Sequence, residues 1–182
     1  MLELGLGDDV RLRLLEDRDA EELYAVIDRN REWLAPWMPW AQGQTLQATR
    51  AFIRQTRRQL AEDDGMQTAI EVGGRIGGVV GVHGISWLHG STTIGYWLAR
   101  DLNGRGIMTA AVRAYLRHAF ETWGLHRMEL RAAVGNTRSR AVAERAGFVR
   151  EGVLRGAERV NGRHHDLVVY GALAPEWART AR

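Results

Sequence analysis

The sequence contains no cysteine, no lysine and only three prolines. Without cysteine, the chain has no disulfide bond, no thiolate metal site and no acyl-cysteine intermediate, and it is compatible with a reducing compartment. All 25 basic residues are therefore arginine, a bias that we attribute to genomic base composition rather than to function. The formal net charge of +3 is mild for 182 residues, so it allows attraction of anionic ligands without requiring nucleic acid.

The sequence also lacks a segment typical of an export signal or a membrane anchor. Residues 1–9 have neither a basic flank nor an apolar stretch. The longest run without Asp, Glu, Lys or Arg covers residues 76–99, but six glycines and two histidines interrupt it. This content favours buried strands over a lipid-facing helix. We therefore predict a cytoplasmic protein that does not bind membranes.

The overall composition is that of one ordinary globular domain. Apolar residues make up 45% of the chain and charged residues 26%, and the sequence shows no internal repeat or low-complexity linker. A chain of this length can bury a sizeable core without metals or disulfides. We predict a single domain over residues 1–182.

Hydrophobic periodicity predicts about seven strands and four helices in the order βααβββαβαββ. The strands are expected at 10–15, 66–72, 75–88, 92–98, 128–134, 149–158 and 165–173, and the helices at 17–31, from 45 onward, at 106–123 and at 137–146. Asp17 is the predicted N-cap of the first helix. A strand–helix–strand connection in the second half implies one parallel pair, so we expect an α/β (α+β) fold with a mixed, mainly antiparallel sheet.

The stretch Asn103-Gly104-Arg105-Gly106 lies between a predicted strand and a predicted helix. Glycine lets the backbone approach a ligand closely, and the first N–H groups of a helix form an anion site, to which Arg105 adds charge. A tight turn that needs glycine only for its geometry explains the same residues. The known ATP and NAD motifs are incomplete, since Thr109 stands where a third glycine would be. This favours another phosphorylated cofactor.

Four stretches of the chain resemble the GNAT superfamily of acetyl-CoA-dependent N-acetyltransferases. They are REWLAPWMPW, IGYWLARDLNGRGIMTAAVRAYLRHAF, NTRSRAVAERAGFVREGVLR and AERVNGRHHDLVVYGAL, and they follow one another in family order. Together they are similar to the RimJ/RimL type, which acetylates N-terminal amines of ribosomal proteins. One position departs from the family pattern, because Asp101 stands where Gln or Arg is common. This departure weakens the expected side-chain contribution of the loop but leaves its backbone N–H groups intact.

The resemblance implies that acetyl-CoA is the co-substrate and that the glycine loop holds its pyrophosphate. The residues implied to bind it are Trp97, Leu98, Asn103, Gly104, Arg105, Gly106, Ile107, Met108, Thr109, Asn136 and Ser139. Backbone N–H groups near Trp97 and Leu98 are natural donors to an oxyanion beside the cofactor. We expect no metal, because His164 and His165 are neighbours on a strand and point to opposite faces.

Acetyl transfer to an amine requires a proton acceptor and a group beside the departing sulfur. An α-amino group has a pKa of about 7.7 to 8.0, so a modest general base suffices. The resemblance assigns this role to Glu158, whose alternative is a solvent-facing strand carboxylate. It places Ser139 beside the sulfur as thiolate stabiliser or proton donor, and the alternative there is a helix cap. Without cysteine, direct attack on the thioester is the simpler mechanism.

The stretch REWLAPWMPW brings several tryptophans together with two prolines. A proline-stiffened aromatic loop suits the wall of a groove that receives a flexible peptide end, although one or two of these rings could simply pack in the core. The resemblance places the loop beside the acceptor site. The expected acceptor-binding residues are Trp33, Trp37, Met38 and Trp40.

We therefore expect an N-acetyltransferase that modifies a protein N-terminus, ribosomal if the resemblance extends to the acceptor, and that forms a homodimer. A close alternative keeps the chemistry but acts on a small amine or an antibiotic. A third reading is a CoA-binding or RNA-binding regulatory module without turnover, which Asp101 and the helix bearing Arg54, Arg57 and Arg58 support. A solvated helix face explains those arginines better, and we expect no direct nucleic-acid binding.

Overall fold

The computed structural model describes residues 3–7 and 9–180, whose strands form one eight-stranded sheet in the order β1-β2-β3-β4-β5-β6-β8-β7. The strands are β1 (Glu3–Gly7), β2 (Val10–Leu14), β3 (Gly65–Val72), β4 (Arg75–Ser86), β5 (Ser91–Leu98), β6 (Arg127–Ala133), β7 (Val149–Val160) and β8 (Arg163–Leu173). Every neighbouring pair is antiparallel except β5 with β6, which is parallel. The predicted mixed sheet is confirmed.

The predicted strand count is one too low, because β1 was not expected. β1 is short and contains two glycines among its five residues, so it carries little strand propensity of its own. Its position is set by antiparallel pairing with β2, in which Leu4 lies opposite Leu12. Tertiary pairing therefore makes a strand where the local sequence does not indicate one.

The helices are α1 (Ala20–Arg29), α2 (Arg31–Leu34), α3 (Leu46–Ala61), α4 (Ile107–Arg117), α5 (Thr137–Ala146) and α6 (Ala174–Thr180). Two 3₁₀ turns, η1 (Asp17–Asp19) and η2 (Arg100–Leu102), precede α1 and α4, and a π turn, η3 (His118–Thr122), continues α4. The predicted helix at 17–31 is thus divided into three pieces, and α6 was not expected. The prediction of about four helices was too low.

The prediction that Asp17 caps the first helix is wrong. The carboxylate of Asp19 accepts the backbone N–H of Glu16 at 2.8 Å, so Asp19 closes the start of this segment. Asp17 instead accepts a hydrogen bond from Arg57 of α3 at 2.8 Å. Glu16 is at the N-cap position, and Asp19, three residues later, forms a capping box with it.

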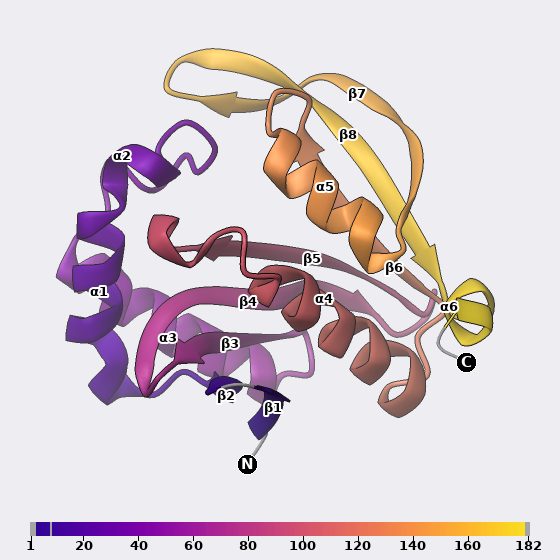
Figure 1. Cartoon of the computed structure of the whole chain (residues 1–182), viewed down its shortest axis with the longest axis horizontal. Coiled ribbons are helices and arrows are strands. Elements are labelled where there is room, and N and C mark those ends of the chain that lie inside the picture. The colour runs from indigo at the N-terminus through magenta and orange to yellow at the C-terminus, as the bar shows by residue number, and fades with distance from the viewer. Residues whose placement is uncertain (1–2, 8, 181–182) are drawn as a thin grey trace.

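Helices cover both faces of the sheet (Figure 1). On one face, α1 and α3 bury Leu23 and Ile53 against a cluster that includes Val79 of β4. On the other face, α4 and α5 bury Tyr115 and Val142 against a cluster that includes Val80. Because side chains alternate along a strand, neighbouring β4 residues enter different clusters. The sheet is therefore sandwiched between two helical layers.

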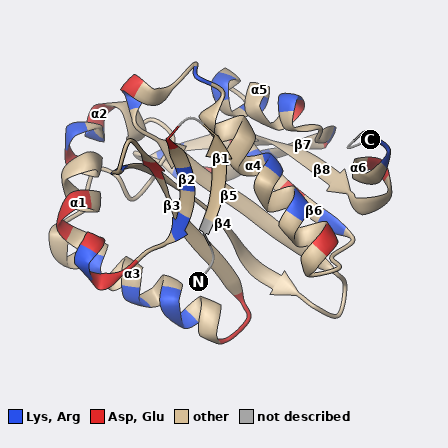
Figure 2. Ribbon diagram, turned by 60° about the horizontal axis from the view of Figure 1, so that its bottom comes forward, with Lys and Arg blue, Asp and Glu red and all other residues tan. Residues whose placement is uncertain are grey.

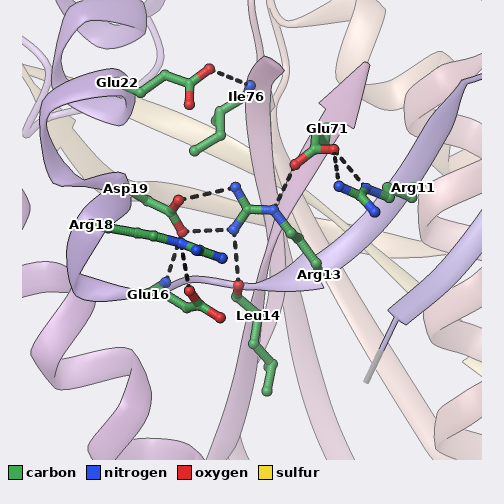
Figure 3. A network of polar contacts seen from close by, with 9 residues as sticks. All are labelled: Arg11, Arg13, Leu14, Glu16, Arg18, Asp19, Glu22, Glu71 and Ile76. Carbon is green, nitrogen blue, oxygen red and sulfur yellow. Dashed lines mark hydrogen bonds and ion pairs between the residues drawn. The ribbon is translucent and has the colours of Figure 1, made fainter. Parts of the chain in front are cut away.

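A network of buried charges joins β2, β3 and η1 (Figure 3). Arg13 donates to Glu71 at 2.6 Å and to Asp19 at 2.7 Å, and Arg11 donates to the other oxygen of Glu71 at 2.6 Å. Burial alone would raise the pKa of Glu71, but the hydrogen bonds from Arg13 and Arg11 outweigh it and hold that pKa below its ordinary value. The buried carboxylates of this region are thus paired.

Charged residues gather on the outward faces of α1 and α3 (Figure 2). There they form exposed pairs such as Arg58 with Glu62, whose Nε and Oε1 atoms lie 2.7 Å apart. This arrangement is the solvated helix face expected for the arginines of α3. Over residues 3–7 and 9–180, no helix combines the length and apolar character needed to cross a membrane.

Candidate functional site

The parallel strands β5 and β6 separate halfway along their length. They pair from Ser91 with Arg127 as far as Ile94 with Leu130, and over the described residues no pairing continues beyond that point. The amide of Ala99 donates to the carbonyl of Gly77 on β4 at 2.8 Å. Backbone groups alternate along a strand, so those of Tyr96 and Leu98 face the opening between β5 and β6, whereas those of Trp97 face β4. Main-chain polar groups in this opening require a partner.

Two adjoining pockets occupy the opening. The larger has a volume of about 530 Å³ and extends from β6 and β7 across β5 to α1 and α3. The smaller, of about 120 Å³, lies between α2, the end of β5, and α5. Both pockets are lined by the same set of residues where they meet, namely Trp37, Met38, Tyr96, Trp97, Asn136 and Ser139.

The fold brings Glu158 and Ser139 to one pocket. Glu158 lies on β7, Ser139 lies in the first turn of α5, and both line the larger pocket. Glu158 is half-buried, so it is neither a core carboxylate nor a fully solvent-facing one. The two residues implied for catalysis thus share a cavity with the opening in the sheet.

The tryptophan loop lies across the opening. Trp40 lines the larger pocket and packs edge-on against Trp97, with ring centroids 6.1 Å apart. Trp33 lines the smaller pocket, and its indole N–H donates to the carbonyl of Leu98 at 3.2 Å. The guanidinium of Arg138 lies 5.0 Å from the Trp33 ring centroid, within the range of a cation–π contact. The loop therefore contributes to both pockets.

The glycine junction has the geometry of an anion site. Gly104 and Gly106 have φ values of 80° and 75°, which favour glycine, and Gly106 is the N-cap of α4. No side chain in the described chain caps this helix, so its first amides are available to a ligand. Asn103 lines the smaller pocket, and its side-chain amide anchors the loop by donating to the carbonyl of Ala99 at 2.8 Å.

The remaining residues of the glycine junction differ in whether their side chains are buried or exposed. Ile107 and Met108 are each 6% exposed and belong to the core, so near the loop they present main-chain groups. Met108 also lines the smaller pocket. Arg105 and Asp101 are both exposed. The junction thus fits a phosphate group chiefly through backbone N–H groups at the start of α4.

The cap of α5 is Asn136 rather than Ser139. The side-chain oxygen of Asn136 accepts the backbone N–H of Ser139 at 3.1 Å. The hydroxyl of Ser139 is directed elsewhere and lies 3.0 Å from the hydroxyl of Tyr96. The capping explanation for Ser139 is therefore wrong, and its hydroxyl is available to the pocket that it lines.

Gln67, His83 and Tyr96 are among the pocket residues that the sequence did not assign to the site. The amide nitrogen of Gln67 lies 2.7 Å from Nδ1 of His83. Gly81 makes room for this pair, because a Cβ there would lie 2.1 Å from the Gln67 side-chain oxygen. Burial lowers the pKa of His83. The available signal was a glutamine within a predicted strand, since a polar side chain that becomes buried needs a partner.

No cluster of three or more His, Cys, Asp or Glu that could hold a metal ion occurs within the described ranges. His164 and His165 lie opposite Arg159 and Glu158, respectively, in the β7–β8 ladder. Successive strand residues project to opposite faces, which agrees with the reason for expecting no shared ion.

Comparisons with known proteins agree with this geometry. The family model of the acetyltransferase (GNAT) domain matches residues 9–149, and the chain belongs to this family. It is 38% identical over 179 residues to the N-acetyltransferase YdaF of Bacillus subtilis (strain 168), covering 97% of this chain and 98% of that protein.

Two solved structures share the fold. One is the microcin C7 self-immunity acetyltransferase MccE in complex with acetyl-CoA and AMP, with 30% identity, a TM-score of 0.87 and coverage of 92% of this chain and 94% of that one. The other is RimL, a ribosomal L7/L12 alpha-N-protein acetyltransferase, in complex with coenzyme A, with 25% identity, a TM-score of 0.90 and coverage of 94% and 98%. The predicted GNAT fold and the resemblance to the RimJ/RimL type are confirmed.

Proposed function

We propose that this chain transfers the acetyl group of acetyl-CoA to the N-terminal α-amino group of a ribosomal protein. The observation that carries the proposal is the opening between β5 and β6, where Glu158 and Ser139 line one pocket beside inward-facing main-chain groups. Similarity to RimL and YdaF supports the choice of acceptor. Neither RimL nor YdaF favours a small amine, an antibiotic or a non-catalytic role as the main function.

The cofactor site comprises residues implied from the sequence together with Tyr96, whereas the backbone groups of Trp97 face β4 instead of the opening. When bound, acetyl-CoA supplies an acetyl thioester. The amides of residues 107–109, with Gly104 and Gly106 before them, hold the diphosphate at the start of α4. The backbone of Tyr96 and Leu98 faces the opening and pairs with the pantetheine arm, while Asn136 lines the pocket beside it. The acetyl-CoA and coenzyme A complexes of MccE and RimL support this assignment.

The proposed catalytic residues act on the attacking amine and on the departing sulfur. Glu158 takes a proton from the acceptor ammonium group, because an amine must be neutral to attack a carbonyl. An amide of β5 that faces the opening donates to the carbonyl oxygen as negative charge develops there. Ser139 donates a hydrogen bond to the departing sulfur. The chain has no cysteine, so the acetyl group passes directly to the amine.

The larger pocket receives the acceptor. Its volume of about 530 Å³ lies in the range of small-ligand sites and can hold the first residues of a peptide. Trp37, Met38 and Trp40 form its wall on the side of α2. Trp33 differs from them, because its hydrogen bond to Leu98 places it beside the cofactor arm. We assign Trp33 to the boundary between cofactor and acceptor.

The test is acetylation of synthetic peptides that carry the N-terminal sequences of ribosomal proteins. Release of free thiol from acetyl-CoA gives the rate, and intact mass gives the number of acetyl groups. Matched peptides with a blocked N-terminus and an internal lysine separate α-amino from ε-amino transfer. We expect transfer to the free N-terminus alone. Faster transfer to a lysine or to a small amine than to any peptide would overturn the assigned acceptor.

The proposed function has consequences for the whole chain. It implies that the chain works as one acetyltransferase domain in the cytoplasm, where ribosomal proteins are made. The homodimer implied by the family resemblance remains part of the proposal, and sedimentation velocity at several concentrations tests it directly.

A further inference from the structure

The hydroxyl of Tyr96 connects the cofactor strand to the helix that carries Ser139. It lies 3.0 Å from the Ser139 hydroxyl oxygen and 3.2 Å from the Ser139 carbonyl oxygen. Tyr96 belongs to β5 and Ser139 to α5, so this contact bridges the opening where β5 and β6 separate. Both residues line both pockets. The contact therefore lies where the thioester and the acceptor meet.

Of these two acceptors, the Ser139 hydroxyl oxygen is the better partner for Tyr96. The Ser139 carbonyl lies inside α5, where it also accepts the backbone N–H four residues later, and its contact with Tyr96 is the longer of the two. Across residues 3–7 and 9–180, the Ser139 hydroxyl makes no hydrogen bond other than the one to Tyr96. When Tyr96 donates to this oxygen, the hydroxyl hydrogen of Ser139 is free to point into the pocket.

The protonation state of Tyr96 supports the same direction of donation. Burial raises the pKa of Tyr96 to about 12, and the smaller, opposing effect of the Ser139 hydrogen bond does not cancel it. The phenol therefore keeps its proton near neutral pH. It can donate a hydrogen bond, but giving up the proton itself is costly.

We propose that Tyr96 is a positioning residue, which donates to the Ser139 hydroxyl oxygen and thereby directs the Ser139 hydroxyl hydrogen at the departing sulfur. This inference rests on the proposed function, because it requires Ser139 to lie beside the thioester. Two hydroxyl groups in series polarise one another, so the second donates more strongly than it would alone. The pair stabilises negative charge on sulfur without itself ionising.

The reaction balances without a proton from either hydroxyl. The bond from the acetyl carbon to the amine nitrogen forms, and the bond from that carbon to sulfur breaks with its electron pair remaining on sulfur. Glu158 takes one proton from the acceptor ammonium group before attack, and the attacking nitrogen releases a second proton to solvent as the amide forms. Tyr96 and Ser139 keep their protons, and the free thiolate takes one from solvent.

Tyr115 provides a matched control. Its hydroxyl is also buried, 3.0 Å from the Thr68 hydroxyl and 3.1 Å from the Val80 carbonyl. Tyr115 belongs to α4, its side chain is buried in the core, and it is absent from the residues that line the two pockets described. Phenylalanine at either position removes one buried phenolic hydroxyl, so both variants incur a similar structural loss.

The first experiment is a double-mutant cycle on steady-state rates. We expect Tyr96→Phe to lower kcat about fivefold, the loss typical of one hydrogen bond, with the KM for acetyl-CoA unchanged. Tyr115→Phe should keep the wild-type kcat. Because Tyr96 acts through Ser139, the variant Tyr96→Phe/Ser139→Ala should be no slower than Ser139→Ala alone.

The second experiment does not depend on turnover. Coenzyme A bound to each variant is titrated with base, and thiolate absorbance is followed against the complex with desulfo-coenzyme A. The wild-type protein and Tyr115→Phe should give the same thiol pKa, and Tyr96→Phe should give a higher one. Thermal unfolding of both phenylalanine variants shows whether their structural losses are indeed matched.

The outcomes distinguish the proposed role of Ser139 in catalysis from the proposed role of Tyr96 in positioning it. If Ser139→Ala keeps the wild-type kcat, the assigned role of Ser139 fails, and this inference fails with it. If Ser139→Ala is slow but Tyr96→Phe is not, only the inference is overturned. It is also overturned if the full Tyr96→Phe loss persists in the Ser139→Ala background, or if the bound thiol pKa does not change.

Discussion

The strands from β1 to β5 differ from the junction between β5 and β6 in how their hydrogen-bonding groups are used. From β1 to β5 each strand pairs with the next over most of its length, and the buried charges beside β2 and β3 are matched to one another. Between β5 and β6, pairing ends at Ile94 and Leu130. Beyond that point, backbone groups of β5 line the two pockets instead of pairing with a neighbouring strand. The carboxylate of Glu158 and the hydroxyls of Tyr96 and Ser139 lie in the same place.

This difference separates residues that hold the fold from residues that do chemistry. A paired buried carboxylate such as Glu71 stabilises the protein only as long as its partners remain. A carboxylate on a pocket wall, such as Glu158, lies where a ligand can reach it, and it is the group that we propose as proton acceptor. Changes in the paired strands should therefore affect stability, and changes at the opening should affect binding and rate.

The largest expected effect is at Glu158. Glu158→Gln removes the proton acceptor and should lower kcat by about 10²-fold or more, the usual contribution of a general base. Thermal unfolding should be unchanged. Thiol release at saturating peptide and acetyl-CoA gives the rate.

Glu151 on the same strand is the control for Glu158. Its carboxylate pairs with both terminal nitrogens of Arg127, at 2.5 and 2.6 Å, outside the two pockets. Glu151→Gln should lower stability and leave kcat at the wild-type value. A Glu158→Gln protein that retains its rate would remove Glu158 from the mechanism.

The second effect is at Glu71, in the paired strands. Glu71→Gln leaves Arg13 and Arg11 without their shared carboxylate and should lower the free energy of unfolding by about 3 kcal/mol. Urea unfolding measures this, and kcat should not change. The control Glu62→Gln breaks the exposed pair with Arg58 and should alter stability very little. Equal losses in the two variants would contradict the distinction between buried and exposed pairs.

The third effect is at the glycine junction. Gly106→Ala places a Cβ at a φ of 75° in front of the first amides of α4 and should weaken coenzyme A binding about tenfold, measured by calorimetry. Gly74→Ala has the same backbone strain, at a φ of 77°, in the β3–β4 turn. Both variants should lose similar stability, and only the first should lose affinity. If Gly74→Ala binds coenzyme A equally weakly, the effect is one of folding.

The smallest effect is on acid stability. Because the pKa of Glu71 is lower in the folded protein than in the unfolded chain, its contribution is complete above about pH 4.3 and is lost as pH falls through the folded pKa. Urea unfolding between neutral pH and pH 3 should show stability decreasing in that window. Glu71→Gln should show a shallower decrease, and an identical decrease would assign acid sensitivity to other carboxylates.

The parts of the fold that were predicted from sequence depend on local signals. The helix at 137–146 is confirmed as α5, because Asn136 caps its start and Gly147, with a φ of 99°, ends it. The turns at Gly73-Gly74 and Asn161-Gly162, each of which lies between two strands expected from the sequence, have the positive φ values that such turns require. By contrast, β1 and the choice between Asp17 and Asp19 depend on partners elsewhere in the chain.

The candidate site likewise contains some residues that the sequence indicated and others that only the structure revealed. The glycine junction was evident from residue types, because only glycine takes those backbone angles without strain. Tyr96 gave no such signal, since a tyrosine in a strand is most often a packing residue. Its contact with Ser139 exists because β5 and α5 are held side by side by the sheet register.

The amino-acid sequence by itself determined the turns, the ends of α5, the absence of thiol chemistry and the strand-to-helix junction suited to an anion. Only the tertiary structure decided where β5 leaves β6, which backbone groups face the opening, and that Glu158 and Ser139 share a pocket. The reason is physical. Local backbone preferences act over a few residues, whereas strand register and helix packing set the distances between residues far apart in the chain.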